Sequence, residues 1–250
     1  MAQYAFGSGA LWGTASVTNP TPSRFGGLQD VSIDFAATVK ELYGQYEFPL
    51  TVARGTVKVT GKAKFAQMQG RLMNDLFFGG TSAAGQINVS DNEAWAIPTT
   101  PYQVTVANST TWTVDLGVRY SVTGIPLTRV ASAPTLGQYS CAAGVYTFAS
   151  ADTGAAVLIS YEFTVATTGQ TITVNNQLLG VAPLFSPVLK QQYTNPAGVS
   201  QQLTLSMTAA TSSKLSLATK LEDFMQPELD FSCFCNAANV LCTMSFAEVN

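Results

Sequence analysis

The stretch RGTVKVTGKAKFAQMQGRLMNDLFFGG, residues 54–80, changes its hydrophobic period midway and therefore joins a strand to a helix. Apolar and polar residues alternate over 56–65, which is typical of a half-buried strand. The period then changes to three and four residues, at Phe65, Met68, Leu72 and Leu76. This spacing predicts an amphipathic helix over about 65–78, which the pair Gly79-Gly80 would end.

Three lysines share the polar face of the predicted strand: Lys58, Lys62 and Lys64. They could contact DNA phosphates, or they could pair with acids on a neighbouring strand. Residues 31–40 also alternate, and we expect an antiparallel register that places Asp34 opposite Lys62. A cross-strand ion pair of this kind contributes up to about 1 kcal/mol. We favour paired or solvated lysines and keep DNA contact as the alternative.

The composition argues for an assembled protein rather than a nucleic-acid binder. Charged residues make up only 11% of the chain, and the net charge is −3. Proteins that bind nucleic acids usually have a basic surface. A surface with so few charges is poorly protected against association, so we expect much of it to be buried between subunits.

The pair Gly61-Lys62 resembles part of a phosphate-binding loop, but the surrounding residues do not fit. Five residues separate Gly55 from Gly61, and Ala63 stands where the motif needs a Ser or Thr for Mg²⁺. The segment is also predicted to be a strand. We therefore expect no nucleotide site.

Other catalytic chemistry has few candidate residues, because the chain contains no histidine. The cysteines include no C-x-x-C pair and are interpreted as reduced thiols: Cys141, Cys233, Cys235 and Cys242. Glu222-Asp223 lie in a predicted turn, and Glu228 and Asp230 share one face of a predicted strand. We interpret these acids as solvated or paired charges, and we expect no enzymatic activity, no cofactor and no metal ion.

Residues 96–166 differ from the rest of the chain in composition. They contain no lysine but five of the nine tyrosines, and their short alternating runs are separated by turn residues. We predict a small, β-sandwich-like domain here, inserted into a discontinuous β domain formed by 1–95 and 167–250. The fold class is therefore mainly β.

Two blocks of sequence carry a family resemblance. VSIDFAATVKELYGQYEFPLTVARGTVKVTGKAKFAQMQGRLMNDLFFG (31–79) and SKLSLATKLEDFMQPELDFSCF (213–234) resemble the major tail tube protein of long-tailed, non-contractile bacteriophages. The resemblance covers the discontinuous domain. The inserted domain is similar to the decorative domains of some tail proteins.

This resemblance implies two packed antiparallel sheets, sandwich- or barrel-like, with one flanking helix. It implies homohexameric rings that stack into a tube in the virion after assembly in the host cytoplasm. The implied partners are the tape measure protein inside the tube and the tail terminator and distal tail or baseplate proteins at its ends. Double-stranded DNA would pass through without specific binding, and no membrane is involved.

In the family, each subunit lends about four strands to a continuous inner barrel. Two dozen strands, spaced ~4.8 Å apart and tilted ~40°, give a circumference of about 150 Å. The resulting channel admits a DNA duplex. Dense lysine on its wall would retain phosphates, so a polar, neutral-to-acidic lining suits passage.

We expect contacts with neighbouring subunits or rings at the turn-rich connection 44–55 and on the charged strand face. The candidate residues are Tyr43, Tyr46, Phe48, Asp34, Lys58, Lys62, Lys64, Glu228 and Asp230.

Three alternatives stay open. A tube ring of a contractile tail or a secretion system would share the fold, although an outward insertion argues against a surrounding sheath. A carbohydrate-binding or adhesion module could use the tyrosine-rich insertion 96–166. A hydrolase would need acids such as Glu222, Asp223 or Asp230.

Overall fold

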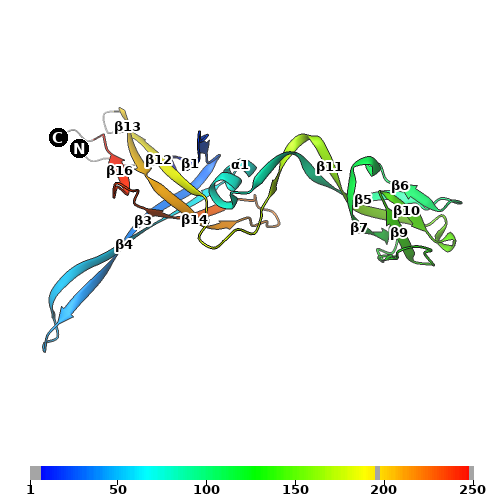
Figure 1. The fold of residues 1–250 in the computed structure, drawn as a ribbon, viewed down its shortest axis with the longest axis horizontal. Helices are drawn as coiled ribbons and strands as arrows, with labels where there is room; N and C mark the ends of the chain where they lie inside the picture. Colours follow the sequence, from blue (N-terminus) through cyan, green and yellow to red (C-terminus); the bar gives the residue numbers. More distant parts are fainter. Residues whose placement is uncertain (1–6, 195–197, 248–250) are drawn as a thin grey trace. The chain divides into compact units, whose positions relative to one another are not determined.

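The computed structural model describes residues 7–194 and 198–247, and it is mainly β, with several antiparallel sheets and a single short α-helix (Figure 1). The chain divides into two compact units. The first comprises Met1–Thr81 and Thr173–Asn250, and the second comprises Ser82–Ile172.

The first unit contains one nine-stranded sheet. Its strands are β1 (Ala10–Ala15), β2 (Ser23–Arg24), β3 (Leu28–Tyr43), β4 (Pro49–Phe65), β12 (Leu184–Thr194), β13 (Ser200–Met207), β14 (Ala209–Ser216), β15 (Glu228–Phe234) and β16 (Cys242–Ser245). One half has the order β2-β1-β12-β13-β16, and the other has the order β14-β15-β4-β3. The consecutive strands β13 and β14 link the halves, because both pair with β12.

Both halves of this sheet contribute to one hydrophobic core. Phe185 and Leu205 come from the first half, and Val59 and Phe231 come from the second. The rings of Phe185 and Phe231 meet edge to face, with centroids 5.6 Å apart. The two packed layers that we predicted are therefore present, but they are the two halves of one hydrogen-bonded sheet.

The helix is shorter than predicted and begins later. α1 spans Gly70–Met73, and a π-helical turn, η1, continues it over Asn74–Phe78. The predicted start at 65 is wrong because β4 runs on to Phe65, whose ring packs against Phe25 at 5.2 Å. The helical segment still buries Leu72, Met73 and Leu76 in the core, and it ends at Gly79 in a left-handed conformation.

The register between β3 and β4 differs by two residues from the predicted one. Ser32 lies opposite Lys62, whereas Asp34 lies opposite Thr60. Bulges interrupt the pairing between Leu28 and Asp30, between Ala37 and Val39, and between Leu42 and Tyr43. Each bulge adds an unpaired residue, so the pairing cannot be counted from the alternation of side chains alone.

Strands β3 and β4 continue as a hairpin beyond the other strands of the first unit (Figure 1). Val31 and Ile33 pack against the core, but Phe35 and Val39 are 43% and 60% exposed. The prediction of a half-buried strand over 31–40 is therefore wrong beyond Ile33 in the single chain.

The second unit consists of two sheets around a core of its own. β5 (Thr81–Ala96), β11 (Ala156–Thr173) and β7 (Trp112–Tyr120) form one sheet; β6 (Gln103–Thr105), β10 (Val145–Phe148), β9 (Gln138–Ala142) and β8 (Thr128–Arg129) form the other. The structural boundaries at 82 and 172 lie outside the predicted 96 and 166. β5 and β11 remain connected there, as the hydrogen bond from the Thr171 hydroxyl to the Gly85 carbonyl illustrates.

Candidate functional site: a charged strand face

The second half of the large sheet has one apolar and one polar face. Residues such as Val59, Ala63 and Phe231 point into the core. Cross-strand neighbours share a face, so the intervening residues gather on the other side. The charged members of this face, named the charged face below, are Asp30, Asp34, Lys58, Lys62, Lys64, Lys214, Glu228 and Asp230. Four acids and four lysines give it a formal charge of zero.

Glu228 is the centre of the ion pairs on the charged face. Its Oε1 atom lies 2.9 Å from Lys62 Nζ and 3.3 Å from Lys214 Nζ. Lys214 Nζ also lies 3.9 Å from Asp230 Oδ2. The hydrogen bond from Lys62 lowers the pKa of Glu228, with further lowering from Lys214, and it raises the pKa of Lys62. The charged forms of both partners are therefore favoured.

The structure brings the sequence-predicted charges together but pairs them differently. Lys62 binds Glu228 rather than Asp34. In the described part of the chain, Asp34, Lys58 and Lys64 have no ion-pair partner within 4.0 Å. The face thus combines paired and unpaired charges.

Sequence reasoning missed Lys214 as a member of this face. A bulge between Ser212 and Lys214 changes which residues of β14 share a face. Counting alternate residues along the segment that contains Lys214 therefore gives no consistent assignment. The available signal for a further lysine was the pair of acids in the segment PELDF, Glu228 and Asp230, because two acids on one strand face favour a basic neighbour.

Gly61 of the apparent phosphate motif has a packing role. A Cβ atom at Gly61 would lie 2.2 Å from the Phe231 ring, which is itself buried. Gly61 and Phe231 are direct cross-strand partners. The glycine is explained by the ring above it, and Lys62 points to the opposite face.

The end of the β3–β4 hairpin carries the aromatic residues predicted to make contacts. Tyr43, Tyr46 and Phe48 are 55%, 72% and 77% exposed. The Tyr43 hydroxyl donates a hydrogen bond to Glu41. Further exposed apolar side chains of the hairpin are Val39, Leu42, Leu50 and Val52. Val39 and Val52 share one face of the hairpin, and Leu42 lies on the other. Exposed apolar side chains gathered in one segment are typical of an interaction site.

The four-stranded half also has two free strand edges. In the described residues, β3 pairs only with β4, and Ser212–Ser216 of β14 pair only with β15. The edge at β3 carries Asp30 and Asp34, whereas the edge at β14 carries Lys214. Unpaired edges of sheets are templates for pairing with another chain.

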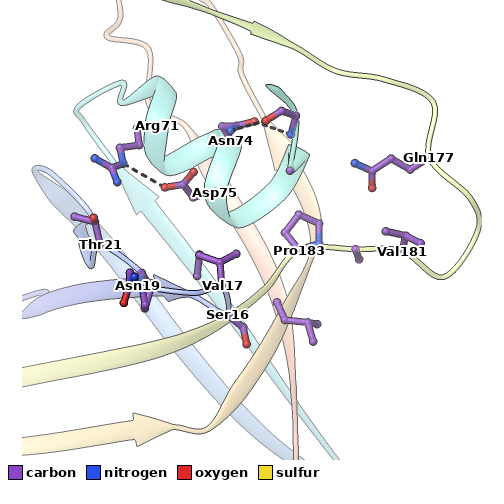
Figure 2. A pocket seen from close by; sticks show the side chains of 16 residues that line it. Ser16, Val17, Asn19, Thr21, Arg71, Asn74, Asp75, Gln177, Val181 and Pro183 are labelled. Carbon is purple, nitrogen blue, oxygen red and sulfur yellow. Dashed lines mark hydrogen bonds and ion pairs between the residues drawn. The ribbon is translucent and has the colours of Figure 1, made fainter. Parts of the chain in front are cut away.

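A pocket of about 580 Å³ lies between the residues after β1, the helical segment and the segment before β12 (Figure 2). Its two charged residues and Asn74 already have partners. Arg71 pairs with Asp75 at 3.4 Å, and the Asn74 side chain exchanges hydrogen bonds with Gly80 at 2.8 and 3.1 Å. The pocket therefore offers no free acid–base pair for catalysis.

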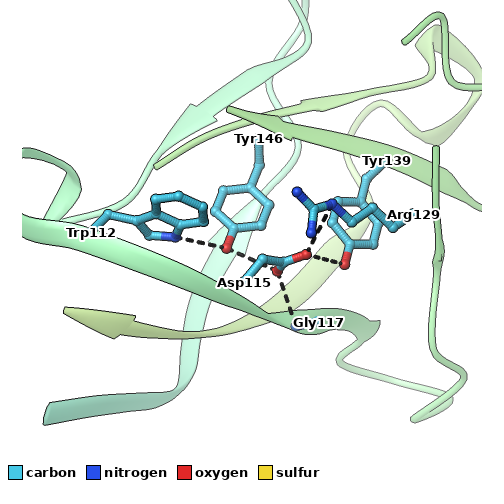
Figure 3. A network of polar contacts seen from close by, with 6 residues as sticks. All are labelled: Trp112, Asp115, Gly117, Arg129, Tyr139 and Tyr146. Carbon is cyan, nitrogen blue, oxygen red and sulfur yellow. Dashed lines mark hydrogen bonds and ion pairs between the residues drawn. The ribbon is translucent and has the colours of Figure 1, made fainter. Parts of the chain in front are cut away.

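A buried carboxylate organises the interior of the second unit (Figure 3). Asp115, whose side chain is 2% exposed, accepts hydrogen bonds from the hydroxyls of Tyr139 and Tyr146 at 2.7 and 3.0 Å. It also accepts one from the Gly117 N–H at 3.0 Å, and Arg129 Nε lies 3.5 Å away. Burial is the main cause that raises the pKa values of both tyrosines.

Residues 7–194 and 198–247 contain neither a cluster of metal ligands nor a membrane-spanning helix. No group of three His, Cys, Asp or Glu side chains within these ranges could hold a metal ion. None of the helices in the same ranges is long and apolar enough to cross a membrane.

The sequence matches no protein-family model and no curated protein. The family resemblance of 31–79 and 213–234 is therefore a hypothesis that must be judged on the geometry of the charged face, the free edges and the hairpin.

Proposed function

We propose that this chain is the structural subunit of a phage tail tube, assembling into stacked hexameric rings around a channel for DNA. In this proposal the β3 edge of one copy pairs with the β14 edge of the next. The four strands β14, β15, β4 and β3 then line the channel with their charged face. Six copies would supply the two dozen strands that a channel of DNA-admitting width needs.

The observation that carries the proposal is the four-stranded layer with a polar, charge-balanced face and two free edges. The core side of this layer is covered by the same chain. Ring closure would remove both edges, which protects a sheet against random association. The opposite charges of Asp34 and Lys214 favour the pairing of unlike edges over the pairing of like ones.

The exposed hairpin supports the same proposal. Its apolar side chains, including Tyr46 and Phe48, have no covering partner in the single described chain. In a stack of rings they would be buried against a further copy. The chain's low content of charged residues agrees with a surface that is largely covered by other subunits.

The adhesion alternative receives less support from the second unit. Three of the tyrosines that suggested a sugar-binding face are buried in the core: Tyr139, Tyr146 and Tyr161. They cannot stack on a glycan without unfolding of the unit.

Charge reversal at the two edges tests the ring contact. Asp34→Lys and Lys214→Asp should each reduce assembly, measured by sedimentation velocity at high protein concentration, and the double variant should restore part of it. Glu162→Lys, on the second unit, is the matched charge reversal and should assemble like the unmodified chain. Normal assembly of both single variants, or an unmodified chain that stays monomeric, would argue against this ring contact.

A further inference from the structure

One carboxylate oxygen on the charged face forms ion pairs with two lysines. Glu228 Oε1 lies within 3.3 Å of both Lys62 Nζ and Lys214 Nζ, although these lysines belong to different strands, β4 and β14. The Glu228 side chain is only 16% exposed, whereas the two lysine side chains are 48% and 57% exposed. The lysines therefore reach toward solvent, and the acid lies between them.

Exposed lysines on a surface that faces DNA have a predictable effect. Each lysine that neutralises a phosphate releases a counterion. In a plot of log affinity against log salt concentration, each such contact makes the slope more negative by about 0.9. Several such contacts in one subunit, repeated around a ring, would retain the duplex. A lysine that is ion-paired with an acid of the same chain loses most of its capacity to neutralise a DNA phosphate.

We propose that Glu228 acts as an internal counter-ion that keeps Lys62 and Lys214 from binding the phosphates of a DNA duplex moving along the charged face. The inference rests on the proposed function for its biological setting. The ion pairs on which it depends belong to the single chain. Asp230 has a secondary role, since it lies 3.9 Å from Lys214 and opposite Lys62 in the sheet.

The test compares the unmodified chain with Glu228→Gln, using fluorescence anisotropy of a labelled, short DNA duplex and unassembled subunits. We expect the variant to bind about tenfold more tightly at low salt, and its salt dependence to steepen by about two phosphate contacts between about 50 and 200 mM salt. Circular dichroism should show unchanged folding, because Glu228 lies outside the core.

Two further variants make the test specific. Glu162→Gln removes the same charge from the second unit and should leave DNA binding unchanged. Lys62→Met combined with Glu228→Gln should lose about half of the gained salt dependence.

The proposal is overturned if Glu228→Gln binds DNA no more tightly than the unmodified chain, or if Glu162→Gln gains as much affinity. These outcomes do not depend on whether the proposed function is correct. Tubes could form while Glu228→Gln shows no gain, and the gain could appear in subunits that never form tubes.

Discussion

Gly61 shows how a single residue that resembles a ligand motif can serve packing. The Phe231 ring occupies the space that a side chain at Gly61 would need. We expect Gly61→Ala to lower the free energy of unfolding by about 1–3 kcal/mol, because neither the strand nor the buried ring can move easily. Urea unfolding measures this change.

A double-mutant cycle with Phe231→Leu provides the control for Gly61. The smaller side chain should relieve part of the overlap, so the double variant should lose less stability than the sum of the single ones. Strictly additive losses would mean that the ring is not the reason for the glycine.

Asp115 is the residue on which the interior of the second unit depends. Asp115→Asn replaces an acceptor-only group by an amide and leaves some of its donors without a partner. We expect a loss of about 2–3 kcal/mol in the free energy of unfolding. Urea unfolding followed by tryptophan fluorescence would measure it, since Trp112 donates a hydrogen bond to Tyr146 beside Asp115.

Asp223→Asn is the matched change for Asp115, because Asp223 is exposed. It should alter stability by less than about 0.5 kcal/mol. Equal effects of the two substitutions would contradict the structural role of Asp115.

At the scale of elements, the pairing of β4, β15 and β14 brings two lysines to Glu228 and shifts its pKa. Glu228 should titrate below its usual pKa of 4.5, mainly because of Lys62 and less because of Lys214. The ion pair then contributes fully to stability above pH 4.5, and the contribution is lost as the pH falls through the lowered value.

NMR titration of Glu228 tests the order of these two lysines. Lys62→Met should raise the pKa of Glu228 more than Lys214→Met does. A Glu228 that titrates at its usual pKa in the unmodified chain would show that the pairs do not persist in solution.

The elements also show what sequence patterns can and cannot specify. Alternation predicted the strands of 31–40 and 56–65 and their polar and apolar faces, because side-chain direction follows directly from strand geometry. It missed the register by two residues, because a shift of two leaves every side chain on the same face and alternation cannot detect it. It missed Lys214 because of the bulge between Ser212 and Lys214. The helix began later than its period predicted, because Phe65 packs as part of β4.

For the whole molecule, the proposed assembly predicts a separation between folding and association. The double variant Tyr46→Ser with Phe48→Ser should leave the free energy of unfolding within about 0.5 kcal/mol, since both side chains are exposed. Its assembly, measured by sedimentation velocity, should be strongly reduced because the hairpin loses its apolar contact.

The matched control for the hairpin is Leu221→Ser with Phe224→Ser, two side chains that are 92% and 87% exposed in the loop before β15. This variant should assemble better than the hairpin variant. Equal assembly of both would show that the hairpin has no special part in association.

Composition and pattern predicted the mainly β fold, and they directed attention to Lys62, Glu228 and Asp230. They could not predict that the apolar face of β3 is left exposed beyond Ile33, because exposure in one chain depends on partners that the alternation does not specify. The same limit applies to the free edge of β14, which depends on where β12 begins.

Electron cryomicroscopy of the protein at high concentration tests the central claim most directly. The account predicts stacked rings with a channel lined by β14, β15, β4 and β3, with Lys62 and Glu228 facing the channel and the hairpin end covered by another copy. Particles that remain monomeric, or a map in which the charged face is packed against protein, would contradict it.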